Sequence, residues 1–255
     1  MKKILSLICA AIVLSACLFA VGCEKTDDGS AARHEPQGSY KIAFLGDSLT
    51  DKGVYSHLVT THYTDYIYDN YPFVNSVQNV GLAGSCIAGL PNKPGVNMSF
   101  VQRYETIDAD ADVIVVLGGT NDFGYGTPAI SNPLGEYGDE TVETFYGALK
   151  VLIDGFGENY PNAKPVFVTP LYRKGQEANG IPTKNKYDFT LSDYVEAIKE
   201  TCEKRGVLCF DAFNEITEID AFTYNDYEID GLHLSTEGNV LLGKYLGDFL
   251  AENLD

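Results

Sequence analysis

Basic residues are scarce in this chain of 255 residues, which has 18 Lys and Arg against 36 Asp and Glu. The first 23 residues contain two of the basic residues and none of the acidic ones, so the rest of the chain has 16 basic against 36 acidic residues, a formal charge of −20. Such a surface repels phosphate backbones and anionic lipid headgroups. We therefore expect no nucleic-acid partner and no docking on anionic membrane surfaces.

Cysteine is also scarce, and beyond position 23 only Cys86, Cys202 and Cys209 occur, without a C-x-x-C pair. This odd number argues against a disulfide framework or a zinc site, although a bridge between Cys202 and Cys209 stays open. The chain also lacks a P-loop, an H-E-x-x-H pair and a G-x-G-x-x-G turn. We therefore expect no cofactor and no metal.

The first 23 residues have the pattern of an export signal, with Lys2 and Lys3 followed by an apolar run. Two cysteines are candidates for lipid attachment: Cys17 follows Leu-Ser-Ala, and Cys23 follows Ala-Val-Gly and precedes the polar EKTDDGS. We favour Cys23, because Cys17 would leave the apolar LFAVG after the anchor. An uncleaved membrane anchor and an ordinary signal peptide are the alternatives.

Residues 24–39 are polar and rich in Gly, Ser and charge, which predicts a flexible tether before a domain at residues 40–255. The expected protein is exported. It is a bacterial lipoprotein on the extracytoplasmic face, or else a secreted protein, and its only membrane contact is an N-terminal lipid.

Apolar runs of strand length alternate with segments of helical period in the domain. Near-continuous Val, Ile, Leu and Phe predict strands buried on both faces, at residues 40–45, 73–80, 112–118, 165–170 and 206–211. Apolar steps of three and four predict helices over 142–156 and 191–202, and Ser235 is a good N-cap for a last helix. The fold class is therefore α/β, a doubly wound three-layer helix–sheet–helix sandwich with a central, mainly parallel five-stranded sheet.

Three further segments are predicted less directly. The Tyr-rich residues 55–72, which contain His57 and His62, have the pattern of an amphipathic helix. Gly- and Pro-rich loops at 123–139 and 172–189 are long enough to be lids or binding loops.

Polar residues follow the strands where an open parallel sheet binds its ligands. Ser48 ends IAFLGDS, Gly84 lies in NVGLAGS, Asn121 lies in LGGTND, and DGLHLS places Asp230 three residues before His233. Each motif alone fits an ordinary turn or helix cap. Together they favour a site with a nucleophile, oxyanion donors and a carboxylate–imidazole pair.

These four segments resemble the sequence blocks of the SGNH hydrolase superfamily, the GDSL-type esterases and lipases, over the whole predicted domain. The resemblance implies a flavodoxin-like fold, with Ser48 as nucleophile, His233 as base and Asp230 as the residue that orients it. It also implies an oxyanion hole formed by the Ser48 and Gly84 backbone N–H groups and the Asn121 amide. The G-x-S-x-G elbow of the other common esterase fold is absent.

We therefore expect a carboxylic ester hydrolase that removes a short acyl group, acetyl above all, from a carbohydrate or another small ester. A lipase, a thioesterase or an acyltransferase would use the same serine and stays open. A protein of a different class, a surface lipoprotein that binds sugars without turnover, also stays open.

Overall fold

The computed structural model describes residues 39–89 and 99–254. The predicted leader, both candidate lipidation cysteines and residues 24–38 of the predicted tether lie outside these residues. The central sheet is parallel, in the order β2-β1-β3-β4-β7. Its strands are β1 (Tyr40–Gly46), β2 (Val74–Gly81), β3 (Val113–Leu117), β4 (Lys164–Val168) and β7 (Leu208–Phe210). The predicted α/β sandwich with a parallel five-stranded sheet is confirmed.

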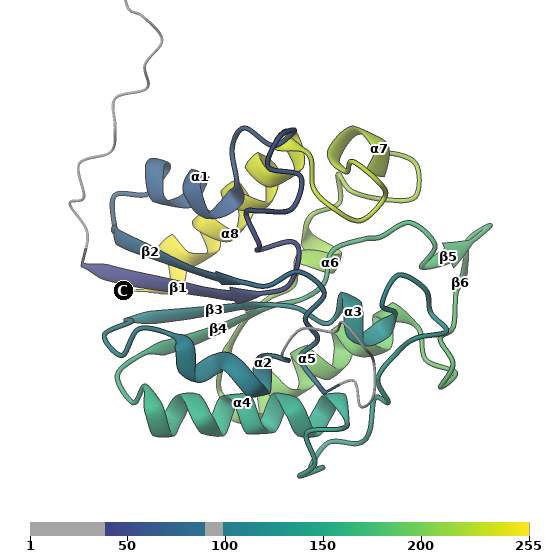
Figure 1. The fold of residues 1–255 in the computed structure, drawn as a ribbon, viewed down its shortest axis with the longest axis horizontal. Helices are drawn as coiled ribbons and strands as arrows, with labels where there is room; N and C mark the ends of the chain where they lie inside the picture. Colours follow the sequence, from purple (N-terminus) through teal and green to yellow (C-terminus); the bar gives the residue numbers. More distant parts are fainter. Residues whose placement is uncertain (1–38, 90–98, 255) are drawn as a thin grey trace, which may run out of the picture. The chain divides into compact units, whose positions relative to one another are not determined.

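Helices cover both faces of this sheet (Figure 1). The long ones are α1 (Tyr63–Asn70), α4 (Phe145–Asn159), α5 (Leu191–Arg205) and α8 (Thr236–Asn253). The short ones are α2 (Phe100–Arg103), η1 (Tyr104–Thr106), α3 (Thr120–Phe123), α6 (Ala212–Glu215) and α7 (Tyr224–Tyr227). A hairpin of β5 (Glu177–Ala178) and β6 (Ile181–Pro182), which the sequence pattern did not indicate, lies in the long loop after β4.

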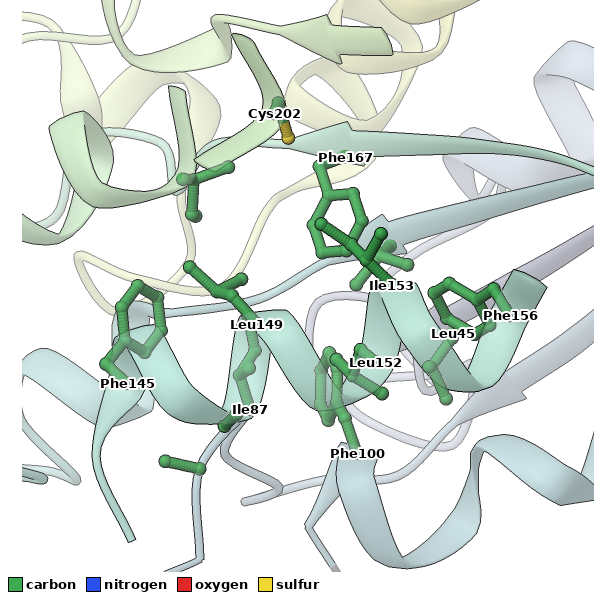
Figure 2. Close-up of a cluster of buried hydrophobic side chains, with 14 of the residues drawn as sticks. Leu45, Ile87, Phe100, Phe145, Leu149, Leu152, Ile153, Phe156, Phe167 and Cys202 are labelled. Carbon is green, nitrogen blue, oxygen red and sulfur yellow. The ribbon is translucent and has the colours of Figure 1, made fainter. Parts of the chain in front are cut away.

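Alternate residues of each strand point into two separate cores. Ala43 and Leu45 of β1 pack with α4 and α5, whereas Ile42 and Phe44 pack with α1 and α8. Figure 2 shows the first core, in which the apolar stripe of α4 lies against side chains from the sheet, α2 and α5. Burial on both faces explains why the inner strands β1 and β3 are apolar at nearly every position, whereas the edge strand β2, expected to be buried on both faces, has polar residues and only Val74 fully buried.

Two predictions about helix boundaries are wrong. The Tyr-rich segment is helical only from Tyr63, because His62 caps the helix by accepting from the Thr64 N–H, and residues 52–58 form turns. Helix α4 starts at Phe145 behind the N-cap Thr144, so Val142 lies outside it and is 40% exposed. Ser235 caps α8 as expected, accepting from the Gly238 N–H.

The register of the sheet brings three strand ends together. Gly46 at the end of β1 pairs with Gly81 of β2 on one side and with Leu117 of β3 on the other. The loops that follow these strands therefore start side by side at the carboxyl edge of the sheet. This edge is where an open parallel sheet binds its ligands.

Candidate active site

The loop after β1 turns sharply at Gly46 and Asp47. A Cβ on Gly46 would come within 1.9 Å of Thr50 Oγ1, so only glycine fits. Asp47 is fully buried and caps the turn: its Oδ1 accepts from the Leu49 N–H at 2.9 Å, and its carbonyl accepts from the Thr50 and Asp51 N–H groups. The half-buried Ser48 is thereby held at the edge of the sheet.

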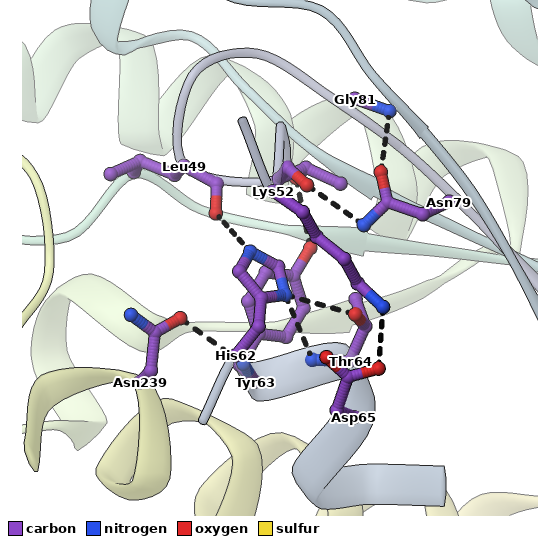
Figure 3. Close-up of polar contacts among 10 residues, drawn as sticks. Leu49, Lys52, His62, Tyr63, Thr64, Asp65, Asn79, Gly81 and Asn239 are labelled. Atoms are coloured by element: carbon purple, nitrogen blue, oxygen red, sulfur yellow. Dashed lines mark hydrogen bonds and ion pairs between the residues drawn. The ribbon is translucent and has the colours of Figure 1, made fainter. Parts of the chain in front are cut away.

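A network of polar side chains supports this turn from beneath (Figure 3). His62 Nδ1 accepts from the Thr64 N–H, which places the proton on Nε2, and Nε2 donates to the Leu49 carbonyl at 3.2 Å. Asn79 Nδ2 donates to the Thr50 carbonyl at 2.8 Å. Burial lowers the pKa of His62 to about 4, so this imidazole is neutral at pH 7. Its place in the network makes His62 a structural residue of the turn.

Asn79 and Gly81 both belong to β2. The amide of Asn79 also accepts from the Gly81 N–H at 3.0 Å. This residue therefore joins the end of β2 to the Ser48 turn.

Ser48, His233 and Asp230 form a hydrogen-bonded relay. His233 Nε2 lies 2.9 Å from Ser48 Oγ, and His233 Nδ1 lies 2.8 Å from Asp230 Oδ2. The other carboxylate oxygen, Asp230 Oδ1, accepts from the backbone N–H groups of His233 at 2.9 Å and Leu232 at 3.1 Å. With the carboxylate on Nδ1, Nε2 is free to accept the serine proton.

A short backbone hairpin holds the Asp230–His233 turn. Glu228 and Leu234 form an antiparallel bridge, and the Ile229 N–H donates to the His233 carbonyl at 2.7 Å. Partial burial by itself would raise the pKa of Asp230, but the bonds from His233 and from the Tyr55 hydroxyl outweigh it and keep the pKa below its ordinary value. Asp230 is therefore ionised at neutral pH.

The loops after β2 and β3 bring Gly84 and Asn121 together. Gly84 has a φ of +78°, a left-handed conformation that favours glycine. Asn121, in α3, is 5% exposed, and its Nδ2 donates to the Ser85 carbonyl at 2.9 Å and to Asp47 Oδ2 at 3.4 Å. The amide of Asn121 thus lies between the Gly84 loop and the Ser48 turn.

Two residues that the sequence motifs did not single out fix these loops. Buried Asp122 accepts from the Ile87 and Ala88 N–H groups at 2.8 and 2.9 Å, which ties α3 to the segment after Gly84. Arg173, also buried, donates through Nη1 to the carbonyls of Thr120 at 2.9 Å and Gly124 at 2.8 Å. Asp122 lies within LGGTND, but no local pattern marks Arg173.

Buried carboxyl groups surround the relay. Burial raises the pKa of Asp47 and of Asp122 to about 6, although the hydrogen bonds that each carboxylate accepts lower it. Burial also raises the pKa of Glu228, to about 8, and the nearby charge of Asp230 adds to the shift. At pH 7 Glu228 is therefore mostly neutral, while Asp47 and Asp122 are mostly ionised.

Among the residues that the structure describes, no set of three or more His, Cys, Asp or Glu side chains is arranged to hold a metal ion. Within the same residues, Cys86, Cys202 and Cys209 form no disulfide bond. Of the other histidines, His57 is exposed beside Tyr55, and His34 lies outside the described residues. None of the described helices has the length and hydropathy needed to cross a bilayer.

Solved structures similar to this chain share its architecture. A protein of Lactobacillus plantarum is 28% identical, with a TM-score of 0.71 over 85% of this chain and 98% of its own. A possible lipase of Chitinophaga pinensis is 18% identical, with a TM-score of 0.65 over 84% of this chain and 98% of its own. A mutant of Axe2, an acetyl-xylooligosaccharide esterase from Geobacillus, is 23% identical, with a TM-score of 0.56 over 86% of this chain and 96% of its own.

No curated protein matches the chain. The model of the GDSL-like lipase/acylhydrolase family matches residues 44–241, which include all of the loops described above. The chain therefore belongs to this family of carboxylic ester hydrolases, within the SGNH hydrolase superfamily.

Proposed function

We propose that this chain is a serine esterase that removes short acyl groups, acetyl above all, from carbohydrate esters. The observation that carries the proposal is the relay from Ser48 through His233 to Asp230, at 2.9 and 2.8 Å. A protein that only bound sugars would have no chemical use for a serine hydrogen-bonded to an imidazole that a carboxylate orients.

In the proposed reaction His233 Nε2 takes the proton of Ser48 as Oγ attacks the ester carbonyl. Asp230 stabilises the imidazolium that forms, and His233 then gives the proton to the leaving alcohol, which leaves an acyl group on Ser48. Water, deprotonated by the same imidazole, releases the acid. The backbone N–H groups of Ser48 and Gly84 and the Asn121 amide would stabilise the oxyanion in both steps.

One feature of the described residues favours a short acyl group. Tyr125 packs against Gly84, since a Cβ on Gly84 would come within 2.8 Å of the Tyr125 hydroxyl oxygen. A long acyl chain would have to pass this ring.

Carbohydrate is the substrate class we infer first, because the Geobacillus neighbour is named an acetyl-xylooligosaccharide esterase. The Chitinophaga neighbour is named a possible lipase. A series of p-nitrophenyl esters from acetyl to decanoyl separates the two activities, and acetate release from acetylated xylo-oligosaccharides tests the sugar. The proposal expects activity that falls steeply with chain length, and higher activity on the long esters would contradict it.

We also infer that the domain works outside the cytoplasm, on a lipid anchor at Cys23. The basic start at Lys2 and Lys3, the apolar run behind it and the polar segment after Cys23 support this proposal. The strong negative charge fits a domain that stays off anionic membranes and reaches them only through its anchor.

A further inference from the structure

We propose that Tyr55 is a positioning residue of the relay, whose hydroxyl holds the Asp230 carboxylate and sets how strongly that carboxylate attracts the proton on His233. The proposal rests on the proposed roles of Ser48, His233 and Asp230. It adds to them a residue from the loop between β1 and α1.

The geometry of Asp230 supports this role. The carboxylate accepts three bonds from its own turn, through Leu232 and His233. The fourth comes from Tyr55, 175 positions away in the chain, whose hydroxyl donates to Oδ2 at 3.0 Å. This is the same oxygen that faces His233 Nδ1, so the tyrosine proton and the imidazole proton share one acceptor.

The ring of Tyr55 also contacts the imidazole itself. The centroids of the Tyr55 and His233 rings are 5.4 Å apart, with an interplanar angle of 61°. This edge-on contact limits rotation of the imidazole away from Ser48. Tyr55 therefore fixes both members of the Asp230–His233 pair.

The backbone at Tyr55 adopts a conformation that a tyrosine seldom takes. Its φ of +52° lies in the left-handed region, where bulky side chains are uncommon and are retained mainly at functional positions. Its carbonyl accepts from the N–H groups of Leu58 and Val59. The Thr60 N–H donates to Thr236 Oγ1 at 3.0 Å, which ties the loop to the start of α8.

The bond to Asp230 raises the pKa of Tyr55, so the hydroxyl keeps its proton over the working range of pH. A donor on Oδ2 reduces the negative charge that the carboxylate presents to the imidazolium. Without the hydroxyl, Asp230 should stabilise the protonated form of His233 more strongly. The acid limb of the pH–rate profile should then move to higher pH.

Other charged or titratable groups also act on this pair. Asp47 interacts with His233, Glu228 and Arg173 interact with Asp230, and His57 lies beside Tyr55 at 6.3 Å between rings. A Tyr55→Phe substitution leaves all four in place. A change in the pH profile of that variant therefore reports on the hydroxyl.

The test is the pH profile of kcat/KM for p-nitrophenyl acetate in the wild type and in Tyr55→Phe. We expect the midpoint of the acid limb to move up by about 0.5 to 1 pH unit, and the plateau to fall by about 3- to 10-fold. Tyr71→Phe is the matched control, because the Tyr71 hydroxyl also donates to a carboxylate, Asp248 Oδ1 at 2.6 Å, on α8. Its profile should equal that of the wild type.

An acid limb that stays in place in Tyr55→Phe would overturn the proposal, whether or not the rate falls, because a purely structural role would lower the rate without moving the limb. Should Tyr55→Phe fail to fold, Tyr55→Gly suits the positive φ; it removes the ring together with the hydroxyl, and the proposal expects its acid limb to move up as well. Ser48→Ala in parallel separates the two proposals. Activity that survives in Ser48→Ala refutes the proposed function, whereas an unmoved limb in a Ser48-dependent enzyme refutes only the role of Tyr55.

Discussion

The amide of Asn121 bridges two loops, donating to the Ser85 carbonyl at 2.9 Å and to Asp47 Oδ2 at 3.4 Å. The second bond is long, so the N–H group that makes it is weakly held. We infer that this N–H group turns from Asp47 to the oxyanion as negative charge develops on the substrate.

Asn121→Ala should therefore lower kcat for p-nitrophenyl acetate by about 100- to 1000-fold with little change in KM, because the bond strengthens only in the transition state. Asn70→Ala is the control, since Asn70 is exposed and its amide donates to the Tyr66 carbonyl within α1. A rise in KM at constant kcat would mean that Asn121 binds the ground state instead.

Histidine 62 should make stability depend on pH. Its pKa is about 4 in the fold and about 6.5 in the unfolded chain, so the unfolded state binds the proton first as the pH falls. The contribution of His62 to the free energy of unfolding is therefore complete above pH 6.5 and is lost as the pH falls towards 4. The total loss is about 3 kcal/mol. Denaturant unfolding between pH 7 and pH 4 measures this loss.

His62→Gln is the comparison for that experiment, because glutamine can donate to Leu49 but does not titrate. Asp47 and Asp122, with pKa values raised to about 6, have the opposite effect on stability. Their contribution to the free energy of unfolding is complete below the pKa of an unfolded aspartate and is lost as the pH rises through 6. Both proteins retain these two groups, so the difference between them isolates His62. Equal pH dependence in the two proteins would contradict the assignment.

Much of the fold was readable from the sequence because its signals are local. Strands buried on both faces, such as β3, are apolar throughout, and Ser235 caps α8 through a bond only three residues long. The approach of His233 to Ser48, 185 positions apart, was predicted from the four motifs taken together and from the family resemblance, since no single local pattern indicates it. The structure brings the two together.

Where the sequence did not predict the structure, the interaction that determines it joins residues far apart in the chain. The Tyr-rich segment has helical periodicity, yet the bonds of His62 to Leu49 and of Tyr55 to Asp230 hold its first half as turns. Arg173 lies in a loop of ordinary polar composition, and only the folded chain shows it buried against Thr120 and Gly124. No periodicity or spacing marks such contacts.

Tyr125 should limit the length of the acyl group. Tyr125→Ala removes the ring that packs against Gly84, so the ratio of kcat/KM for hexanoyl to acetyl esters should rise by about 10-fold. Tyr137→Ala, a change of an exposed tyrosine that contacts Tyr146, is the control. An unchanged ratio in Tyr125→Ala would place the acyl group elsewhere.

The lipid anchor can be tested in a bacterial host by labelling with palmitate. Cys23→Ala should abolish labelling, whereas Cys17→Ala should leave it intact. The opposite result would assign the anchor to Cys17. A wild type that takes up no palmitate would contradict lipidation.

The central claim is that Ser48 is the nucleophile. The most direct measurement is mass spectrometry of the protein after reaction with a fluorophosphonate, followed by peptide mapping. The account predicts one adduct, on the peptide that contains Ser48, together with loss of both the adduct and p-nitrophenyl acetate hydrolysis in Ser48→Ala. An adduct on another residue, or full hydrolytic activity in Ser48→Ala, would contradict it.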